Sequence, residues 1–452
     1  MFSDKYDPDA DIQALATPPG ESALAIIRLA GPETRQKFSR IFSNSNWCLN
    51  GKGNTLKQGF IVRNGNKLDQ VVVSLFCAPA SYTGQDMIEI YCHGNMPGIK
   101  KIQDLLNKSG FRDASPGEFT FRAFLNGKID LTQAEAVKEI ISSKTGKAHK
   151  LALERLSGGV RDIVVKLRDD LLLLVSQIEI QLDYPEDELD DQVSDIAPHL
   201  LETRDTILKL LAGYKSGKAY RSGARIALAG RTNTGKSSLF NLFLKEDRAI
   251  VSDIHGATRD YLEAWINIDG IPAMLIDTAG IREAENALED EGIRRGLEKA
   301  GECHLVLYVI DGEKGANDED RRRIAAFEKK AIVIKVWNKS DLRKPESSDD
   351  GTAICALSGD GLPGLENAIK NAVFGGDYTE SELLLDSDRQ KALFEECLSF
   401  LDTAIEGLDN YLPLDAVVID IRSALDSLGS VCGKIDSADI LEKMFSEFCV
   451  GK

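Results

Sequence analysis

The residues with the clearest chemistry form the run GRTNTGKS at positions 230–237, between a short apolar segment (225–229) and an apolar, helix-forming one. Its glycines let the backbone curl so that successive N–H groups face a phosphate, and the following helix adds its positive end. Lys236 is expected to reach the terminal phosphates of a nucleotide, and Ser237 is expected to ligate Mg²⁺. The expected phosphate-site residues are Asn233, Thr234, Gly235, Lys236, Ser237 and Ser238.

Two further segments lie where such a site needs them. The run DTAG, made of Asp277, Thr278, Ala279 and Gly280, ends an apolar strand with a carboxylate suited to Mg²⁺ and a glycine that can approach the γ-phosphate. The run NKSD at 338–341 follows another predicted strand. Asp341 can accept from both N1–H and the N2 amine of guanine, a pairing that adenine does not offer.

The other residues of the NKSD run have roles in the same interpretation. Asn338 is expected to join this segment to the phosphate loop, and the stem of Lys339 can lie over the purine ring. Cys355 and the residues after it occupy the place of a final base-contacting loop. The sequence therefore predicts a GTP-binding domain that hydrolyses GTP, and not an ATPase.

The residue after Gly280 is Ile281, not the glutamine that orients water in Ras-like proteins. No arginine is an evident finger, although Arg259 and Arg282 lie in the expected switch regions. A monovalent cation or a second subunit could therefore supply the positive charge near the β- and γ-phosphates.

The elements that must position these residues follow from periodicity. Residues 1–126 are predicted to be mixed α/β, with strands at 71–76 and 87–91, and helical periodicity then runs from about 131 to the proline at 185. A second helical stretch covers roughly 192–218, and an α/β region is followed by helices at 384–449. The predicted fold is an α/β N-terminal domain (1–126), a helical domain (127–220 and 382–452) and an inserted Ras-like P-loop domain (221–381).

Composition excludes several other classes of protein. The chain of 452 residues has a net charge of −17, which argues against a broad basic face for nucleic acid but leaves a local basic patch or a basic partner open. If RNA is bound, a second subunit is expected to supply much of the contact. No apolar run approaches the length of a membrane span, and the acidic N-terminus lacks the features of a signal peptide. The 8 cysteines form no CxxC pair, so a cytoplasmic protein with reduced thiols is expected.

Further strings are spread over nearly the whole chain, namely ALATPPG (14–20), YTGQD (82–86), PGEFT (116–120), RAFLNGK (122–128) and FCVGK (448–452). They resemble the MnmE (TrmE) family of tRNA-modification GTPases. The resemblance implies a homodimer built through a folate-binding N-terminal domain. It also implies a heterotetramer with a flavin-dependent MnmG (GidA)-like partner that modifies the wobble uridine of tRNA at carbon 5.

The same resemblance implies further site residues. K⁺ would replace an arginine finger and be surrounded by Asn233, Ser252, Ile254 and Ala257. Thr258 would join Ser237 on Mg²⁺, and Glu289 would orient the attacking water indirectly. Ser252 and Ala257 stand where the family usually has threonines. Ser252 and Ile254 would offer main-chain carbonyls, which tolerate the first change, whereas alanine at 257 removes a hydroxyl, so one contact to K⁺ is either lost or left to a carbonyl or to water.

For the N-terminal domain, the resemblance implies a site for 5-formyltetrahydrofolate. The matching residues are Arg28, Glu89, Lys128 and Lys452, and Cys449 would assist the modification. A glutamate can pair with the amino and N3–H edge of the pterin, and basic residues suit the glutamate tail of folate. Surface ion pairs and a buried apolar cysteine are the alternatives for these residues.

Two other functions stay open at this point. One is an Era-like GTPase switch in ribosome assembly, although no compact basic RNA-binding module is visible in the sequence. The other is an N-terminal folate module that senses one-carbon status without donating carbon.

Overall fold

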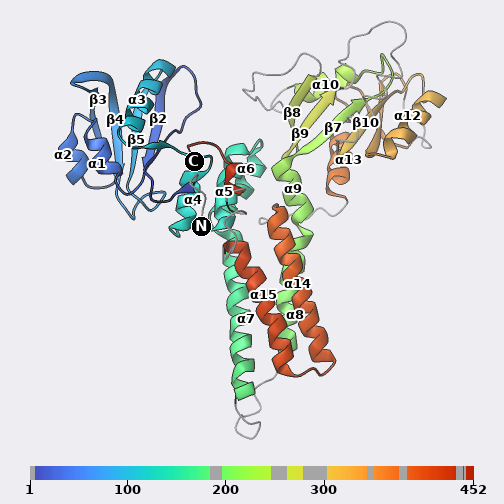
Figure 1. Cartoon of the computed structure of the whole chain (residues 1–452). Coiled ribbons are helices and arrows are strands. Elements are labelled where there is room, and N and C mark those ends of the chain that lie inside the picture. The colour runs from blue at the N-terminus through green and yellow to red at the C-terminus, as the bar shows by residue number, and fades with distance from the viewer. Residues whose placement is uncertain are drawn as a thin grey trace. The chain divides into compact units, whose positions relative to one another are not determined.

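The computed structural model describes residues 6–183, 196–245, 262–277, 303–343, 350–375, 384–433, 441 and 444–451. The chain divides into two compact units, Met1–Lys138 with Gly429–Lys452 (unit 1) and Glu139–Leu428 (unit 2). Each unit contains its own sheet, and a set of long helices accompanies the second sheet (Figure 1). The predicted fold class, α/β domains combined with a helical domain, is confirmed.

Unit 1 is built on a six-stranded sheet in the order β3-β4-β5-β2-β1-β6. Only β1 and β6 are parallel, and the other neighbours are antiparallel. The strands are β1 (Ile12–Leu15), β2 (Ser22–Ala30), β3 (Thr55–Arg63), β4 (Asn66–Phe76), β5 (Met87–Gly94) and β6 (Arg112–Asp113). The strands predicted at 71–76 and 87–91 are confirmed as parts of β4 and β5.

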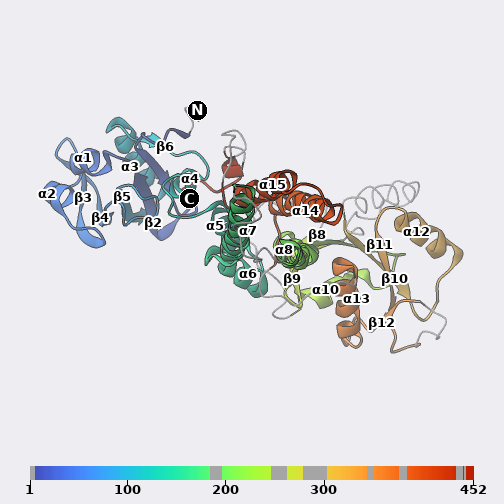
Figure 2. The ribbon, with the colours of Figure 1, turned by 90° about the horizontal axis from the view of Figure 1, so that it is seen from below.

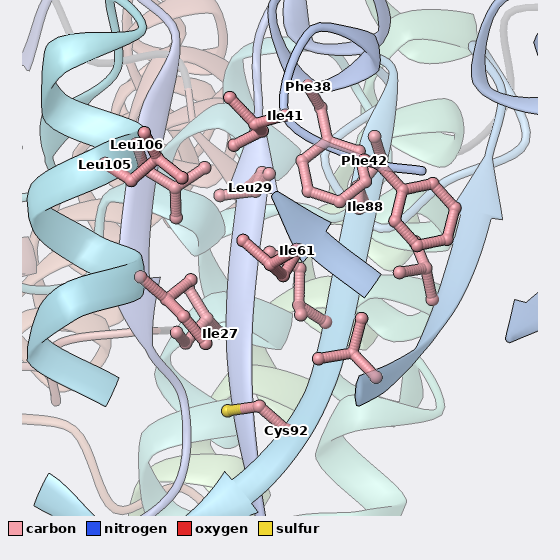
Figure 3. Packing of buried hydrophobic residues seen from close by; sticks show 14 of the residues in the cluster. Ile27, Leu29, Phe38, Ile41, Phe42, Ile61, Ile88, Cys92, Leu105 and Leu106 are labelled. Atoms are coloured by element: carbon pink, nitrogen blue, oxygen red, sulfur yellow. The ribbon is translucent and has the colours of Figure 1, made fainter. Parts of the chain in front are cut away.

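Helices cover this sheet because their apolar residues recur at helical spacing. In α3 (Met96–Lys108), Ile99, Ile102, Leu105 and Leu106 are buried on one side, and the Asn95 side chain caps the helix by accepting from the Gly98 N–H at 2.8 Å. Figure 3 shows Leu105 and Leu106 gathered with Ile27 and Leu29 of β2. The other helices are α1 (Thr34–Ser39), α2 (Ser45–Asn50), α4 (Glu118–Leu125) and the first part of α5 (Leu131–Ser142).

Unit 2 contains a second six-stranded sheet in the order β12-β11-β10-β7-β9-β8. All neighbours are parallel except β8 and β9, which form an antiparallel hairpin. Its elements are β7 (Ala224–Ala229), α10 (Lys236–Leu244), β8 (Leu262–Ile268), β9 (Ile271–Asp277), β10 (Leu305–Asp311), α12 (Asp318–Glu328), β11 (Ile332–Asn338), β12 (Thr352–Ile354) and α13 (Leu362–Phe374). Every residue of β10 is buried, as expected for a central parallel strand.

Unit 2 also contains helices that precede its sheet in the sequence and helices that follow it. The continuous periodicity expected after residue 131 is divided into α5, α6 (Gly146–Leu156) and α7 (Gly159–Asp183), because Thr145 caps α6 and Gly158 has a φ of +104°. The remaining helices are α8 (Ile196–Ala212), α9 (Tyr214–Ser222), α14 (Asp388–Asp409) and α15 (Leu414–Cys432). Figures 1 and 2 both show α8 beside α14, so helices from before and after the sheet pack together.

Buried ion pairs fix the segment around Asp386, which connects the sheet of unit 2 to the helices that follow it. The guanidinium of Arg155 in α6 pairs with Glu139 of α5 at 2.6 Å and with Asp386 at 2.7 Å. Arg155 also donates to the Leu384 carbonyl at 3.1 Å, and Arg221 of α9 donates to the Asp386 carbonyl at 3.1 Å. The segment that leaves the sheet is therefore fastened beside α9, the helix that leads into it.

Within the described ranges, no helix combines the length and the apolar character that crossing a lipid bilayer requires.

Candidate functional site

The glycine-rich run predicted to bind phosphate forms the turn between β7 and α10. β7 ends at Ala229, and α10 begins at Lys236. Gly230 and Gly235 have φ values of +140° and +93°, a region that L side chains rarely adopt. A Cβ on Gly235 would lie 2.0 Å from the Asn338 amide nitrogen, and this amide is held by hydrogen bonds on both of its sides, so a larger residue at 235 would have to displace it.

Lys236 lies folded over this turn. Its Nζ donates to the carbonyls of Gly230 at 2.9 Å and Arg231 at 2.6 Å, and the residue is 8 % exposed. The Thr234 hydroxyl donates to the same Arg231 carbonyl at 2.9 Å. The ammonium group is thus held at the mouth of the turn, where it can exchange carbonyl oxygens for phosphate oxygens.

Asn338, the last residue of β11, joins the phosphate loop to the expected base-binding side. Its Nδ2 donates to the Thr234 carbonyl at 2.8 Å, and its Oδ1 accepts from the Ala356 N–H at 3.0 Å. The residue is 3 % exposed, so both bonds are shielded from water. This is the connection that the NKSD run predicts for Asn338.

The next residue, Lys339, is fixed by a carboxylate at the end of the neighbouring strand. Its Nζ pairs with the Asp311 Oδ2 at 2.7 Å, and its φ is +62°. Burial by itself raises the pKa of Asp311, but the bond from Lys339 and the backbone N–H groups of Glu313 and Lys314 hold it below the ordinary value. Asp311 therefore stays ionised and keeps Lys339 in place.

Most of the remaining predicted nucleotide residues are open to solvent where they are described, but Cys355 of the last predicted base-contacting loop is buried. Asn233, Ser237 and Asp341 are exposed, and Ser238 is half-buried. Asp277 closes β9, and its backbone lies in register with Leu228 of β7. The carboxyl ends of β7, β9, β10 and β11 thus meet at one edge of the sheet, the edge where open α/β sheets bind ligands.

Several predicted residues lie outside the described part of the chain. They are Ser252, Ile254, Ala257, Thr258, Arg259, Thr278, Ala279, Gly280, Arg282, Glu289, Lys452 and the side chain of Asp277.

A second group of predicted residues meets in unit 1. Arg28 of β2 and Glu89 of β5 are directly opposite each other in the antiparallel pair. The Arg28 Nε donates to the Glu89 Oε1 at 2.9 Å, and an Nη of Arg28 lies 2.8 Å from the same oxygen. These side chains are 19 % and 14 % exposed, so the pair lies in a partly open surface and not in the core.

The C-terminal segment contacts Arg28 of this pair and the turn before α4. Arg28 Nη1 donates to the Gly451 carbonyl at 2.9 Å, and the Cys449 carbonyl accepts from the Gly117 N–H at 3.2 Å. The side chain of Cys449 is exposed, which excludes the buried apolar cysteine considered from the sequence. Lys128 is exposed and donates to the Pro79 carbonyl at 3.1 Å, and the hydrogen bonds described for unit 1 do not connect it to Arg28 or Glu89.

Two residues at these sites were missed in the sequence. Tyr91 donates to the Glu89 Oε2 at 2.9 Å, and burial together with the Glu89 carboxylate raises the pKa of Tyr91. Its signal is the period of two along β5, which places Tyr91 on the face of Glu89. Asp311 ends a buried strand as Asp277 does, and this repeated pattern of apolar strand followed by aspartate could have indicated it.

Comparison with protein families gives two matches that together span most of the chain. Residues 131–449 match the MnmE helical domain, and residues 11–128 match the N-terminus of the GTP-binding protein TrmE.

Individual relatives align over nearly their full length. A protein of Natranaerobius thermophilus named tRNA modification GTPase MnmE is 37 % identical, covering 98 % of this chain and 99 % of that relative. The protein of the same name from Borreliella afzelii is 40 % identical, and the alignment covers 100 % of both chains. The one from a Thermotoga species is 39 % identical, covering 98 % of this chain and 99 % of that relative.

Among solved structures, the G domain of the FeoB iron transporter of Thermotoga maritima is 23 % identical, with a TM-score of 0.27, covering 33 % of this chain and 98 % of that one. That likeness is too low to bear on function. The family models and the full-length relatives decide the matter: the chain belongs to the MnmE family of tRNA modification GTPases.

Proposed function

We propose that this chain is a Mg²⁺-dependent, K⁺-stimulated GTP hydrolase that drives carbon-5, aminomethyl-type modification of the tRNA wobble uridine together with a flavin-dependent MnmG (GidA)-like protein. One observation carries the proposal. The chain combines the guanine-nucleotide loops with an N-terminal Arg28–Glu89 pair closed by the C-terminal segment, and relatives named tRNA modification GTPases align over this whole combination.

In the nucleotide site, each described residue has a physical role that fits GTP. The curled turn from Gly230 to Gly235 offers N–H groups to phosphate, and Lys236 moves from its own loop carbonyls to the β- and γ-phosphates. Asp341 selects guanine, and Asn338 holds the base side against the phosphate side. We assign Asp277, Thr278, Ala279 and Gly280 to the γ-phosphate side on the strength of the sequence.

The donor sets suit two cations. Ser237 has an exposed hydroxyl in the first turn of α10, and with Thr258 it would hold Mg²⁺. Asn233 is exposed with a φ of +62°, and its amide oxygen would hold K⁺ together with Ser252, Ile254 and Ala257. K⁺, when bound, supplies positive charge beside the β- and γ-phosphates, while Glu289 would orient the attacking water.

In unit 1, the Arg28–Glu89 pair suits the pterin edge of 5-formyltetrahydrofolate. The Glu89 carboxylate accepts hydrogen bonds from Arg28 and Tyr91 and stays partly exposed, so its remaining lone pairs could accept from a bound pterin. Lys128 is exposed and, with Lys452, would attract the carboxylates of the folate tail. Cys449 is exposed and would assist the modification.

The assembly belongs to the same proposal. Residues 1–126 would form the dimerisation and folate-binding domain, 127–220 and 382–452 the helical domain, and 221–381 the GTPase domain. The homodimer would join the flavoprotein in a cytoplasmic heterotetramer that binds tRNA. Ordering of the switch loops by the γ-phosphate, and their release after hydrolysis, would drive the conformational cycle.

The first experiment compares GTP hydrolysis by the purified chain in KCl and NaCl at equal ionic strength. We expect K⁺ to raise kcat by at least about tenfold and Asn233→Ala to lose the stimulation. Asn241→Ala is the matched control, since Asn241 is exposed on α10 away from the turn. Equal rates in both salts would remove the K⁺ mechanism but leave the GTPase.

A second experiment tests the substrate. Wobble nucleosides of tRNA from a strain lacking the gene are compared by mass spectrometry with those of the parent strain. Loss of the carbon-5 substituent is expected. Unchanged nucleosides would refute the modification and favour an Era-like GTPase switch, a function that the matches to the N-terminal and helical domain models do not favour.

A further inference from the structure

The side chain of Arg231, the residue after the first glycine of the phosphate loop, is held by α12. Its Nε donates to the Asp320 Oδ1 at 3.0 Å, and its Nη2 lies 2.9 Å from the Asp320 Oδ2. Nη2 also donates to the Gly315 carbonyl at 3.2 Å. This is the two-pronged arginine–carboxylate geometry that fixes orientation as well as distance.

Asp320 is itself fixed on several sides. It is 0 % exposed and is the third residue of α12, where it forms a capping box with Asn317. The Tyr308 hydroxyl donates to its Oδ1 at 2.9 Å, and burial together with the Asp320 carboxylate raises the pKa of Tyr308, which keeps that hydroxyl a donor. The carboxylate is therefore a rigid anchor between β10 and α12.

The backbone of Arg231 performs a second task in the loop. Its carbonyl accepts from both the Lys236 ammonium, at 2.6 Å, and the Thr234 hydroxyl, at 2.9 Å. The residue held by α12 through its side chain thus presents the oxygen that orients the groups facing the phosphates.

We propose that Arg231 and Asp320 are positioning residues for GTP: their ion pair holds the phosphate loop in the conformation that receives the β- and γ-phosphates. The proposal rests on the nucleotide site and is independent of the K⁺ and wobble-uridine parts of the proposed function. The base side depends on other groups, because Asn338 and the Asp311–Lys339 pair fix it. Loss of the Arg231–Asp320 pair should therefore weaken phosphate contacts more than base contacts.

The test measures equilibrium dissociation constants of the full chain for GDP and for GMP, which lacks the β-phosphate. For Arg231→Ala and Asp320→Asn, we expect the dissociation constant for GDP to rise at least about tenfold and that for GMP to change less than about twofold. Arg231→Lys keeps one charged contact to Asp320 and should recover part of the loss. KM for GTP should rise in parallel with the GDP constant.

Asp318→Asn is the matched control, since Asp318 lies in the same first turn of α12 and pairs with Arg321 in an exposed ion pair. A purely structural role would lower thermal stability in Asp320→Asn without changing the ratio of the GDP and GMP constants. An unchanged ratio in Arg231→Ala would overturn the proposal. Arg231 is 25 % exposed, so this variant and Arg231→Lys decide the question even if Asp320→Asn does not fold.

Discussion

Replacing Asn338 by alanine should remove the hydrogen bonds that connect the phosphate loop at Thr234 with the predicted base-contacting loop at Ala356. The substitution leaves the Thr234 carbonyl and the Ala356 N–H without the partners that they have at 2.8 and 3.0 Å. Both residues are buried, at 2 % and 6 % exposure, so solvent does not readily replace the lost amide. Each unsatisfied buried group costs about 1–3 kcal/mol, which gives about 2–6 kcal/mol for the variant.

The magnitude converts into a measurable shift in unfolding temperature. For a domain of this size, 1 kcal/mol corresponds to about 2–4 °C, so a loss of about 3 kcal/mol lowers the unfolding temperature of the GTPase sheet by about 6–12 °C. Two of the 3 tryptophans, Trp265 in β8 and Trp337 in β11, lie in this sheet. Tryptophan fluorescence in a Trp47→Phe background therefore reports its unfolding, without nucleotide because a ligand raises the midpoint.

Two companion variants separate the contributions. Asn338→Asp keeps an acceptor for the Ala356 N–H but places a carboxylate oxygen against the Thr234 carbonyl, so it should be at least as destabilising as alanine. Ser358→Ala removes an exposed bond to Asp360 in the neighbouring loop and should change stability by less than about 0.5 kcal/mol. A shift below about 2 °C in Asn338→Ala would refute the argument that this buried amide fastens the two loops.

Three other outcomes follow from the geometry. Gly235→Ala should weaken GDP binding at least about a hundredfold in titration, since a Cβ there would lie 2.0 Å from the Asn338 amide; near-normal affinity would contradict the steric argument. At the proposed folate site, Glu89→Gln should weaken binding of 5-formyltetrahydrofolate about 10–100-fold in calorimetry, with Asp69→Asn on β4 as control; equal loss in both would remove Glu89 from the proposed site. Iodoacetamide at pH 8, with labelling followed by mass spectrometry, should modify exposed Cys449 long before Cys92, because burial raises the pKa of Cys92 to about 11 and leaves about a thousandth of it as thiolate. The labelling rate of Cys92 should rise with pH up to about 11. Labelling of Cys92 before Cys449 would contradict the burial of Cys92.

The glycine turn and the bridge made by Asn338 could be predicted from the sequence because each depends on a short run of residues. The phosphate turn needs glycines at fixed positions, and the amide of Asn338 has few uses at a buried strand end other than bridging two loops. Contacts between distant positions were not predictable in this way. Arg231 and Asp320 are 89 residues apart, and only the parallel order of β7 and β10 brings their elements together.

The N-terminal unit illustrates the same limit. Alternating apolar residues predict strands in β4 and β5, but they do not specify strand order or register. The contact between Arg28 and Glu89 depends on that register, and its closure by Gly451 joins residues separated by 423 positions. A one-residue slip would turn Glu89 to the other face of the sheet, so periodicity alone could name these residues but not bring them together.

The contact between Asp386 and α9 bears on whether the region between them can be deleted or replaced. Because Arg221 on the way into the sheet bonds the Asp386 carbonyl on the way out, the two crossings of the polypeptide lie next to each other. A region whose two ends are adjacent can be deleted and its flanks joined by a short linker at little entropic cost. Deletion of the region between Gly223 and Leu384 should therefore leave helices α8 and α14 still able to pack. A foreign domain with close termini could be inserted at the same position.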